Sequence, residues 1–260
     1  MILRVGTSGW QYRSWVGPFY PPGLPAGRWL AHYAGQFSTV EVNSSFYRLP
    51  EASAVRAWAA TLPADFVVAA KASRYLTHVR RLRDPAEPVG RLMGRLGHLG
   101  PRLGPVLLQL HPGHRLDLEA LGATLAAFPP GQRLVLEARH PSWFTDEVYA
   151  LLEARQAALC LADRRGPLGP LERTAPWAYL RLHGGRGRPE GCYGARALAS
   201  WLERLAGLWG PDEEAFVYFN NDAHACAVSN ARELARLAAS RGHTVAGSLP
   251  EARRPTGGRP

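Results

Sequence analysis

The chain has 260 residues, of which 46% are hydrophobic and 20% are charged, and its formal net charge is +10. This length predicts one or two domains, and the hydrophobic content excludes wholesale disorder. No apolar run approaches the ~18 residues that a membrane span needs, and the residues after Met1 do not resemble a signal peptide. The 3 cysteines are scattered, which predicts reduced thiols in a cytoplasmic protein, without a disulfide framework or a paired zinc motif.

The basic residues are divided very unequally between the two types. Of the 31 lysine and arginine residues, only Lys71 is a lysine. A solvated surface charge tolerates either residue, whereas a guanidinium cannot replace a compact ammonium that approaches a small group or shifts its pKa. We therefore expect a functional role for Lys71; the alternative is that it survives by chance.

Short β-like runs alternate with helix-like segments along the chain. The strand runs are 2–5, 39–42, 66–70, 106–110, 134–137, 158–162, 178–182 and 215–219. The helical segments, with apolar spacings of three and four, are 27–37, 52–61, 88–99, 118–128, 145–155, 195–208 and 225–239. Strands that alternate with helices predict parallel strands, and eight such units predict an α/β, single-domain TIM (β/α)8-type barrel.

Two segments lack these patterns. Residues 163–176 are rich in glycine and proline and show no helical spacing. Residues 247–260 have almost no apolar side chains, so we expect a disordered basic tail there and a barrel domain over residues 1–246.

At the carboxyl ends of the predicted strands, polar residues occupy the positions whose side chains share one face of the strand. Side chains alternate along a strand, and the outer face of a barrel strand is buried under helices, so the polar face is expected to point inward. The polar residues expected on this inward face are Glu41, Asn43, Lys71, Gln109, His111, Glu137, Asp163, Arg181 and His183. The carboxyl ends form the barrel mouth, where this fold builds its active sites. The alternative is a purely structural layer of internal salt bridges.

The loops after the strands add aromatic and small polar side chains. They include Thr7, Ser8, Trp10, Phe46, Tyr47, His78, His140, Trp143 and Asn221. Exposed aromatics beside arginines suit phosphates and stacked rings, and Trp10, Phe46 and Trp143 are expected to stack on a ligand ring. The alternatives are an aromatic core that packs a long loop and an arginine-rich composition that places arginines in every loop.

Carboxylate and imidazole groups at the mouth are of the types that bind zinc or manganese. They are Glu41, His111, Glu137, His140, Asp163, His183, Asp222 and His224. The sequence has no His-Glu-x-x-His motif or cysteine pair, and Lys71 and Arg181 in the same layer would repel a cation. We therefore predict no cofactor and keep a divalent metal as the weaker alternative.

Several motifs, in order along the chain, resemble the YecE-like family, domain of unknown function 72. They occupy residues 6–10 with 19–21, 41–48, 71–78, 137–144, 181–184 and 218–224. The resemblance implies a TIM-barrel fold over nearly the whole chain and implies no reaction, because the family has none assigned. One departure is His111-Pro112, where the family usually has two prolines, and this argues against a catalytic His111.

These observations favour an enzyme that acts on a phosphate-bearing or otherwise anionic substrate by hydrolysis or lyase chemistry. Lys71 is expected to polarise an anionic oxygen or act as an amine nucleophile, and Glu137 to act as general base or acid with Glu41 as its partner. The residues assigned to substrate binding are Thr7, Ser8, Trp10, Asn43, Phe46, Tyr47, His78, Gln109, His140, Trp143, Asp163, Arg181, His183 and Asn221.

Three other functions remain open. The positive charge and the arginine-aromatic loops suit a nucleic-acid-binding protein or repair-type nuclease. Glu41 and Glu137 as a carboxylate pair suit a glycoside hydrolase-like enzyme. The third is a non-catalytic, ligand-sensing barrel. The expected partner is an anionic small molecule or a nucleic acid and not a membrane, and the oligomeric state is left open.

Overall fold

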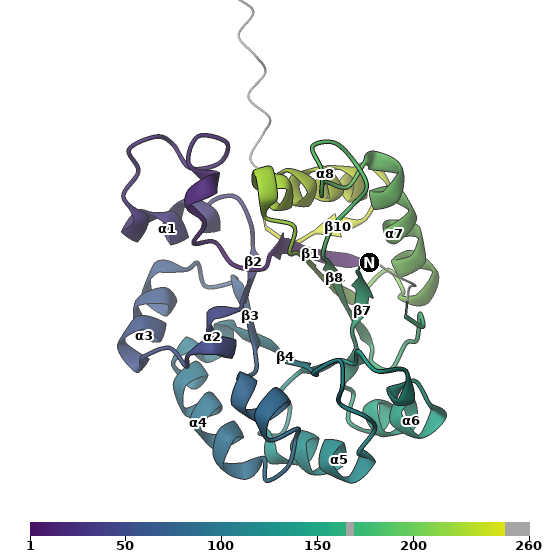
Figure 1. Cartoon of the computed structure of the whole chain (residues 1–260). Helices are drawn as coiled ribbons and strands as arrows, with labels where there is room; N and C mark the ends of the chain where they lie inside the picture. Colours follow the sequence, from purple (N-terminus) through teal and green to yellow (C-terminus); the bar gives the residue numbers. More distant parts are fainter. Residues whose placement is uncertain (165–168, 248–260) are drawn as a thin grey trace, which may run out of the picture.

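The computed structural model describes residues 1–164 and 169–247, in which ten strands form two five-stranded parallel sheets (Figure 1). One sheet has the strand order β10-β1-β9-β8-β7, and the other has the order β2-β3-β4-β5-β6. The strands are β1 (Ile2–Thr7), β2 (Thr39–Val42), β3 (Val67–Lys71), β4 (Leu103–Gln109), β5 (Leu134–Glu137), β6 (Ala158–Leu159), β7 (Leu161–Asp163), β8 (Trp177–Leu182), β9 (Glu214–Phe219) and β10 (Thr244–Val245). All the predicted strands are present. The sixth is divided into β6 and β7 at Cys160, and β10 is an addition to the prediction.

The two sheets are joined at two places. β6 pairs with β5 and β7 pairs with β8, so the continuous segment through Cys160 connects the sheets on one side. On the other side, a parallel bridge between Ser8 and Glu41 connects the end of β1 to β2. Gly6 permits this approach, because a Cβ at that position would collide with the carbonyl oxygen of Thr39. The described residues thus form one mixed α/β domain with two linked parallel sheets, which confirms the α/β, single-domain part of the prediction.

Helices surround the strands (Figure 1). They are α1 (Trp29–Ala34), α2 (Ser44–Tyr47), α3 (Ala52–Thr61), α4 (Ala86–Leu96), α5 (Leu118–Ala127), α6 (Asp146–Ala154), α7 (Ala195–Leu208) and α8 (Cys226–Ser240). Short helical turns are η1 (Arg13–Trp15), η2 (Ala26–Arg28), η3 (Tyr75–Val79), η4 (Gly97–Arg102), η5 (Pro141–Trp143) and η6 (Ala223–Ala225). Every predicted helix is present with ends shifted by a few residues at most, whereas α2, with 4 residues, is too short to show a helical period. No helix in the described ranges is both long and apolar enough to cross a membrane.

α5 shows how local sequence sets these elements. It follows Asp117, whose carboxylate accepts a hydrogen bond from the backbone N–H of Ala120 at 3.0 Å and so satisfies a free donor of the first turn. Its buried residues recur at helical spacing as Ala120, Leu121, Thr124 and Leu125. The helix therefore covers the sheet with one apolar face, as its sequence pattern predicts.

Alternation along the strands separates two apolar layers. On β3, Val68 and Ala70 belong to the main core between strands and helices, whereas Ala69 belongs to a smaller core among the strands. The smaller core contains Ala69, Leu107, Val135, Ala158, Cys160, Ala175, Trp177, Tyr179, Phe216 and Tyr218, from both sheets. Because Lys71 lies two residues after Ala69, its side chain points into the same interior at the carboxyl end of the strand.

Two predictions fall partly on residues that are not described. The segment 163–176 contains no helix in its described part, and residues 165–168 lie outside the described residues. Of the predicted tail, residues 248–260 also lie outside them, so the tail and the domain boundary stay predictions.

The cysteine prediction is wrong for two of the three thiols. Cys192, in the loop after β8, forms a disulfide with Cys226, the first residue of α8, and only Cys160 is free and buried. The partners are 34 positions apart in sequence, but the fold brings their Cα atoms to 5.0 Å. The disulfide also removes the basis for expecting a cytoplasmic location, which rested on reduced thiols.

Candidate active site at the carboxyl ends of the strands

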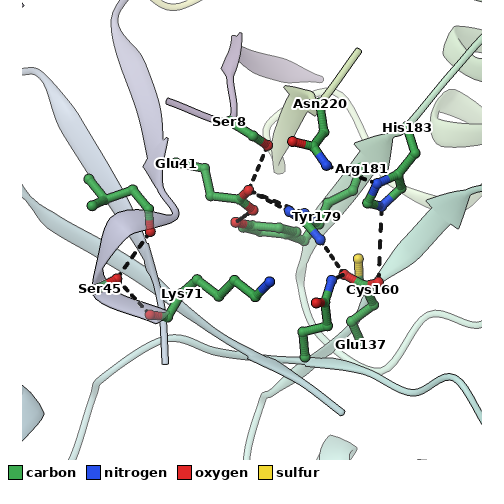
Figure 2. Close-up of polar contacts among 12 residues, drawn as sticks. Ser8, Glu41, Ser45, Lys71, Glu137, Cys160, Tyr179, Arg181, His183 and Asn220 are labelled. Carbon is green, nitrogen blue, oxygen red and sulfur yellow. Dashed lines mark hydrogen bonds and ion pairs between the residues drawn. The ribbon is translucent and has the colours of Figure 1, made fainter. Parts of the chain in front are cut away.

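A buried guanidinium lies between two buried carboxylates (Figure 2). Nη2 and Nε of Arg181, on β8, donate to Oε1 of Glu41, on β2, at 2.8 and 3.2 Å. Nη1 donates to Oε2 of Glu137, on β5, at 2.6 Å. The Arg181 side chain is 1% exposed and both glutamate side chains are 0% exposed. Because an unpaired buried charge costs several kcal/mol, each of these groups depends on the others to stay charged.

The Glu41 carboxylate is also held by neutral donors. The hydroxyl of Tyr179 donates to Oε2 at 2.6 Å, and Oγ of Ser8 donates to Oε1 at 2.6 Å. Burial raises the pKa of Tyr179 well above its usual value, and the neighbouring Glu41 charge adds to this. A phenol that stays protonated keeps donating, so Glu41 retains both hydrogen bonds at neutral pH.

Glu137 is held in its ionised form. Nε2 of Gln109 donates to its Oε2 at 2.9 Å, and Nε and Nη2 of Arg139 each lie 3.2 Å from its Oε1. Burial by itself raises the pKa of Glu137, but its cationic neighbours, Arg181 first among them, lower it well below its usual value. Glu137 therefore carries no proton at neutral pH, and the general-acid half of its predicted role has no support in this geometry.

Lys71 ends β3 and extends its ammonium into the same interior (Figure 2). Nζ lies 3.9 Å from the centroid of the Phe46 ring, and the residue is 8% exposed. Within the described chain, Nζ has no hydrogen-bond or ion-pair partner. Burial, followed by the charge of Arg181, lowers the pKa of Lys71 to about 8, although Glu41 and Glu137 oppose the shift. At pH 7 about a tenth of this amine is therefore unprotonated, a far larger fraction than in an exposed lysine.

His183, directly after β8, is a neutral imidazole beside the cluster. Nδ2 of Asn220 lies 3.1 Å from its Nδ1, and its Nε2 lies 4.0 Å from Oε1 of Glu137. Burial, followed by the charge of Arg181, lowers the pKa of His183 to about 4, so its approach to Glu137 is not an ion pair at neutral pH. Nε2 of His183 and Oδ1 of Asn43 are both buried without a hydrogen-bond partner in the described chain.

Phe46, on α2, brings three predicted site residues together. Its ring lies under Lys71 and meets the rings of Tyr47 and His78 edge-on, with centroids 5.0 and 4.9 Å apart. Tyr47 is 81% exposed. Burial, followed by His111 and Lys71, lowers the pKa of His78 to about 4, so this imidazole is also neutral at pH 7.

Three residues predicted to bind substrate belong to the framework instead. Trp10 is 5% exposed and meets Trp58 edge-on, and Trp143 is completely buried in the main core. Thr7 is also completely buried, and its Oγ1 lies 2.9 Å from the hydroxyl of Tyr33. The structure thus corrects the expectation that Trp10 and Trp143 stack on a ligand, because neighbouring side chains already pack against both rings. The alternative of an aromatic core under a long loop applies here.

Three further predicted residues also have local partners. Oδ2 of Asp163 accepts from the indole N–H of Trp201 at 3.0 Å, and Nδ2 of Asn221 donates to Oδ1 of Asn230 at 3.1 Å. Nδ1 of His140 accepts from a backbone N–H two residues later, at the start of η5. These residues hold loops at the mouth and do not contact the charged cluster, which we define as Glu41, Lys71, Glu137, Arg139 and Arg181.

Sequence reasoning did not assign Tyr179, Arg139 or Asn220 to the site. Tyr179 lies two residues before Arg181 on β8 and therefore shares its inward face, so the same alternation rule identifies it. Arg139 lies in the loop after β5, and its contact with Glu137 depends on the turn that this loop makes, which strand alternation does not predict. Asn220 lies within the motif 218–224 that resembles the family, but that resemblance assigns it no role.

Two hollows adjoin these residues. One, of about 300 Å³, lies behind Phe46 and is lined by Tyr47, Ser73, Arg74, Tyr75 and Arg91 among others, but not by Lys71. The other, of about 690 Å³, follows the loop after His183 and is lined by Asp163, Arg164, Arg186, Tyr193, Trp201 and Arg204 among others.

The carboxylate and imidazole side chains at the mouth are dispersed in the part of the chain that the structure describes. No group of three or more His, Cys, Asp and Glu side chains there is arranged to hold a metal ion. The carboxylates at the centre, Glu41 and Glu137, already share Arg181.

Comparison with known proteins now identifies the family. A family model described as "Protein of unknown function DUF72" matches residues 4–255. The chain belongs to the DUF72 family. This DUF72 chain is 30% identical to the UPF0759 protein YecE of Escherichia coli K12 over 145 residues, which are 55% of the chain and 50% of that relative, so the match spans half the relative's length. It is 23% identical to the UPF0759 protein YunF of Bacillus subtilis 168 over 269 residues, covering 91% of the chain and 94% of YunF.

Solved structures resemble the DUF72 chain over most of its length. A DUF72 family protein from Thermotoga maritima matches with a TM-score of 0.80 and 27% identity, covering 91% of this chain and 99% of that one. The protein SacUVDE matches with a TM-score of 0.51 and 9% identity, covering 91% and 97%. At that identity, the likeness to SacUVDE shows the fold alone.

Proposed function

We propose that this DUF72 protein is an enzyme, a hydrolase or lyase, that acts on an anionic, phosphate-bearing substrate at the charged cluster. The observation that supports it most is the unpaired ammonium of Lys71. Every other charge of the cluster has an ion-pair partner, since Arg181 and Arg139 bind the two glutamates. A buried cation without a partner is unfavourable, and an incoming anion provides that partner.

The charge balance of the cluster points the same way. It contains three basic side chains and two acidic ones. A substrate phosphate or carboxylate beside Lys71 would bring the cluster closer to neutrality and would accept hydrogen bonds from the ammonium.

The proposed roles follow from the contacts. Lys71 binds or attacks the substrate, and Arg181 holds Glu41 and Glu137 in place through hydrogen bonds. The unpaired Nε2 of His183 and Oδ1 of Asn43 offer a hydrogen-bonding atom each to a bound ligand. As part of this proposal, the two linked sheets act as one (β/α)8-type barrel with the cluster at its mouth.

The other candidate functions have less support. A glycoside hydrolase needs one carboxylic acid that is protonated at neutral pH, whereas cationic neighbours lower the pKa of Glu137 well below its usual value. The nucleic-acid alternative rests on the net charge of +10, and the likeness to SacUVDE adds only the fold.

Anion binding at Lys71 is tested by thermal denaturation with inorganic phosphate and with phosphate esters. A ligand present at 100 times its Kd stabilises the native state by about 2.7 kcal/mol. We expect stabilisation of the wild type, a comparable effect in Lys71→Arg, which keeps the charge, and its loss in Lys71→Met. The matched control is Arg241→Met, which removes a positive charge that is 37% exposed and lines neither hollow. Equal stabilisation of wild type and Lys71→Met would refute the proposal.

A further inference from the structure

We propose that Lys71 is a covalent catalyst, whose amine forms an imine with a small carbonyl substrate that carries a carboxylate or a phosphate. The proposal rests on the proposed anionic function and specifies its chemistry. It makes this chain a lyase-type enzyme in which the lysine holds the substrate through a carbon–nitrogen bond.

The position of Nζ is the first argument. The amine lies at the carboxyl end of β3, 3.9 Å from the centroid of the Phe46 ring, and the residue is 8% exposed. It donates no hydrogen bond and forms no ion pair within the described chain. The lone pair of the neutral amine is therefore free to attack a carbonyl carbon.

The surroundings of Lys71 favour the neutral amine. A lysine becomes nucleophilic when it is desolvated or lies next to another cation, and both conditions hold here. Burial is the larger influence and Arg181 the second, and together they bring the pKa to about 8. The other charged or titratable groups that face the amine are Glu41, Glu137, Arg139 and His78.

The residue type is the third argument. Lys71 is the only lysine among 31 basic residues, and a guanidinium is never deprotonated in a protein and forms no imine. The other 30 of the 31 lysine and arginine residues are arginines, and the single lysine lies at a buried position, where a neutral amine is chemically distinct from a guanidinium.

The reaction balances without a further reactant. The lone pair of Nζ attacks the carbonyl carbon, a carbon–nitrogen bond forms, and the carbonyl π electrons move to oxygen. One amine proton transfers to that oxygen to give a carbinolamine. The hydroxyl then leaves with the second amine proton as water, and the carbon–nitrogen double bond remains.

Nearby groups assist these steps. With Asn220 donating to Nδ1 of His183, the proton of the neutral imidazole resides on the unpaired Nε2, which can donate to the carbinolamine oxygen. Protonation of the imine by solvent places a positive charge near the ionised carboxylate of Glu137, which stabilises it.

The test uses the fact that Lys71 and the N-terminal amine are the only primary amines of the chain. The full-length native protein is treated with glyoxylate and sodium cyanoborohydride at pH 7.5, and the reduced adduct is located by peptide mass spectrometry. A pKa of about 8 instead of about 10.5 raises the neutral fraction at this pH on the order of a hundredfold. We expect Lys71 to be labelled at least ten times faster in the native protein than after unfolding in urea.

The matched control is Arg241→Lys, which adds a reference lysine directly after α8, at a side chain that is 37% exposed and pairs with Glu203. If Lys71 is labelled no faster than Lys at that position, the imine proposal is wrong. Suppose that phosphate no longer stabilises Lys71→Met and that glyoxylate does not label Lys71 in the wild type. The anion site would then be supported, the imine would be refuted, and the role of Lys71 would be electrostatic. Rapid labelling without any phosphate effect would support the imine and refute a phosphate-bearing substrate, because glyoxylate itself carries a carboxylate.

Discussion

Replacing Arg181 by methionine is the most direct perturbation of the buried cluster. The substitution keeps much of the side-chain volume but removes the three hydrogen bonds that hold Glu41 and Glu137, whose side chains have no exposed surface. Removal of one partner from a buried ion pair costs about 3–5 kcal/mol. We expect a loss of at least this size at neutral pH, because two carboxylates lose their shared cation.

The loss is expected to depend on pH. In the wild type, the folded-state pKa of Glu137 lies below its unfolded value, so its charge contributes stability above about pH 4.3 that is lost as the pH falls through the folded-state pKa. In Arg181→Met, burial dominates and raises that pKa, so stability is lost as the pH rises above about 4.3. The difference between the two proteins therefore shrinks toward acid pH.

Urea unfolding followed by tryptophan fluorescence at pH 8 and pH 4.5 measures both effects. The matched control is Arg91→Met, which breaks an ion pair to Glu87 with side chains 69% and 60% exposed and is expected to change stability by less than about 0.5 kcal/mol. If Arg181→Met costs no more than this control, or costs the same at both pH values, the account of the cluster is wrong.

Two further predictions concern single contacts. Tyr179→Phe removes a 2.6 Å hydrogen bond to the buried Glu41 and is expected to cost about 1–3 kcal/mol in urea unfolding, whereas Tyr47→Phe, at a site 81% exposed, should change nothing measurable. Loss of the disulfide in a Cys192→Ser, Cys226→Ser double variant is expected to cost about 3–4 kcal/mol for partners 34 positions apart. A thiol titration of the unfolded, unreduced wild type that finds three free thiols instead of one would contradict the second prediction.

The predicted helices and strands agree with the structure where the segment is long enough to show a repeating pattern of apolar residues. The segments 52–61 and 195–208 were predicted with the bounds of α3 and α7. α2 was missed because four residues complete barely one turn, and β10 because its two residues are identified only by pairing with β1. Short elements depend on tertiary partners, so their own sequence carries little information.

The candidate site was predictable to the extent that strand alternation defines a face. Alternation placed Glu41, Lys71, Glu137 and Arg181 inward, and the structure brings all four to one interior. It did not separate ligand-facing aromatics from packed ones, and Trp143 proved to be core. An aromatic residue has the same sequence signature in either setting, because only its neighbours in space determine which face is free.

By itself, the sequence determined the order of strands and helices and the inward face of each strand, and it showed that Lys71 is the single lysine. Only the tertiary structure decided that Arg181 bridges Glu41, 140 positions away, and Glu137, 44 positions away, while Lys71 stays unpaired. It also decided which cysteines pair. The physical reason is that local periodicity acts over a few residues, whereas the pairing of buried charges depends on distances that exist only after the strands have assembled.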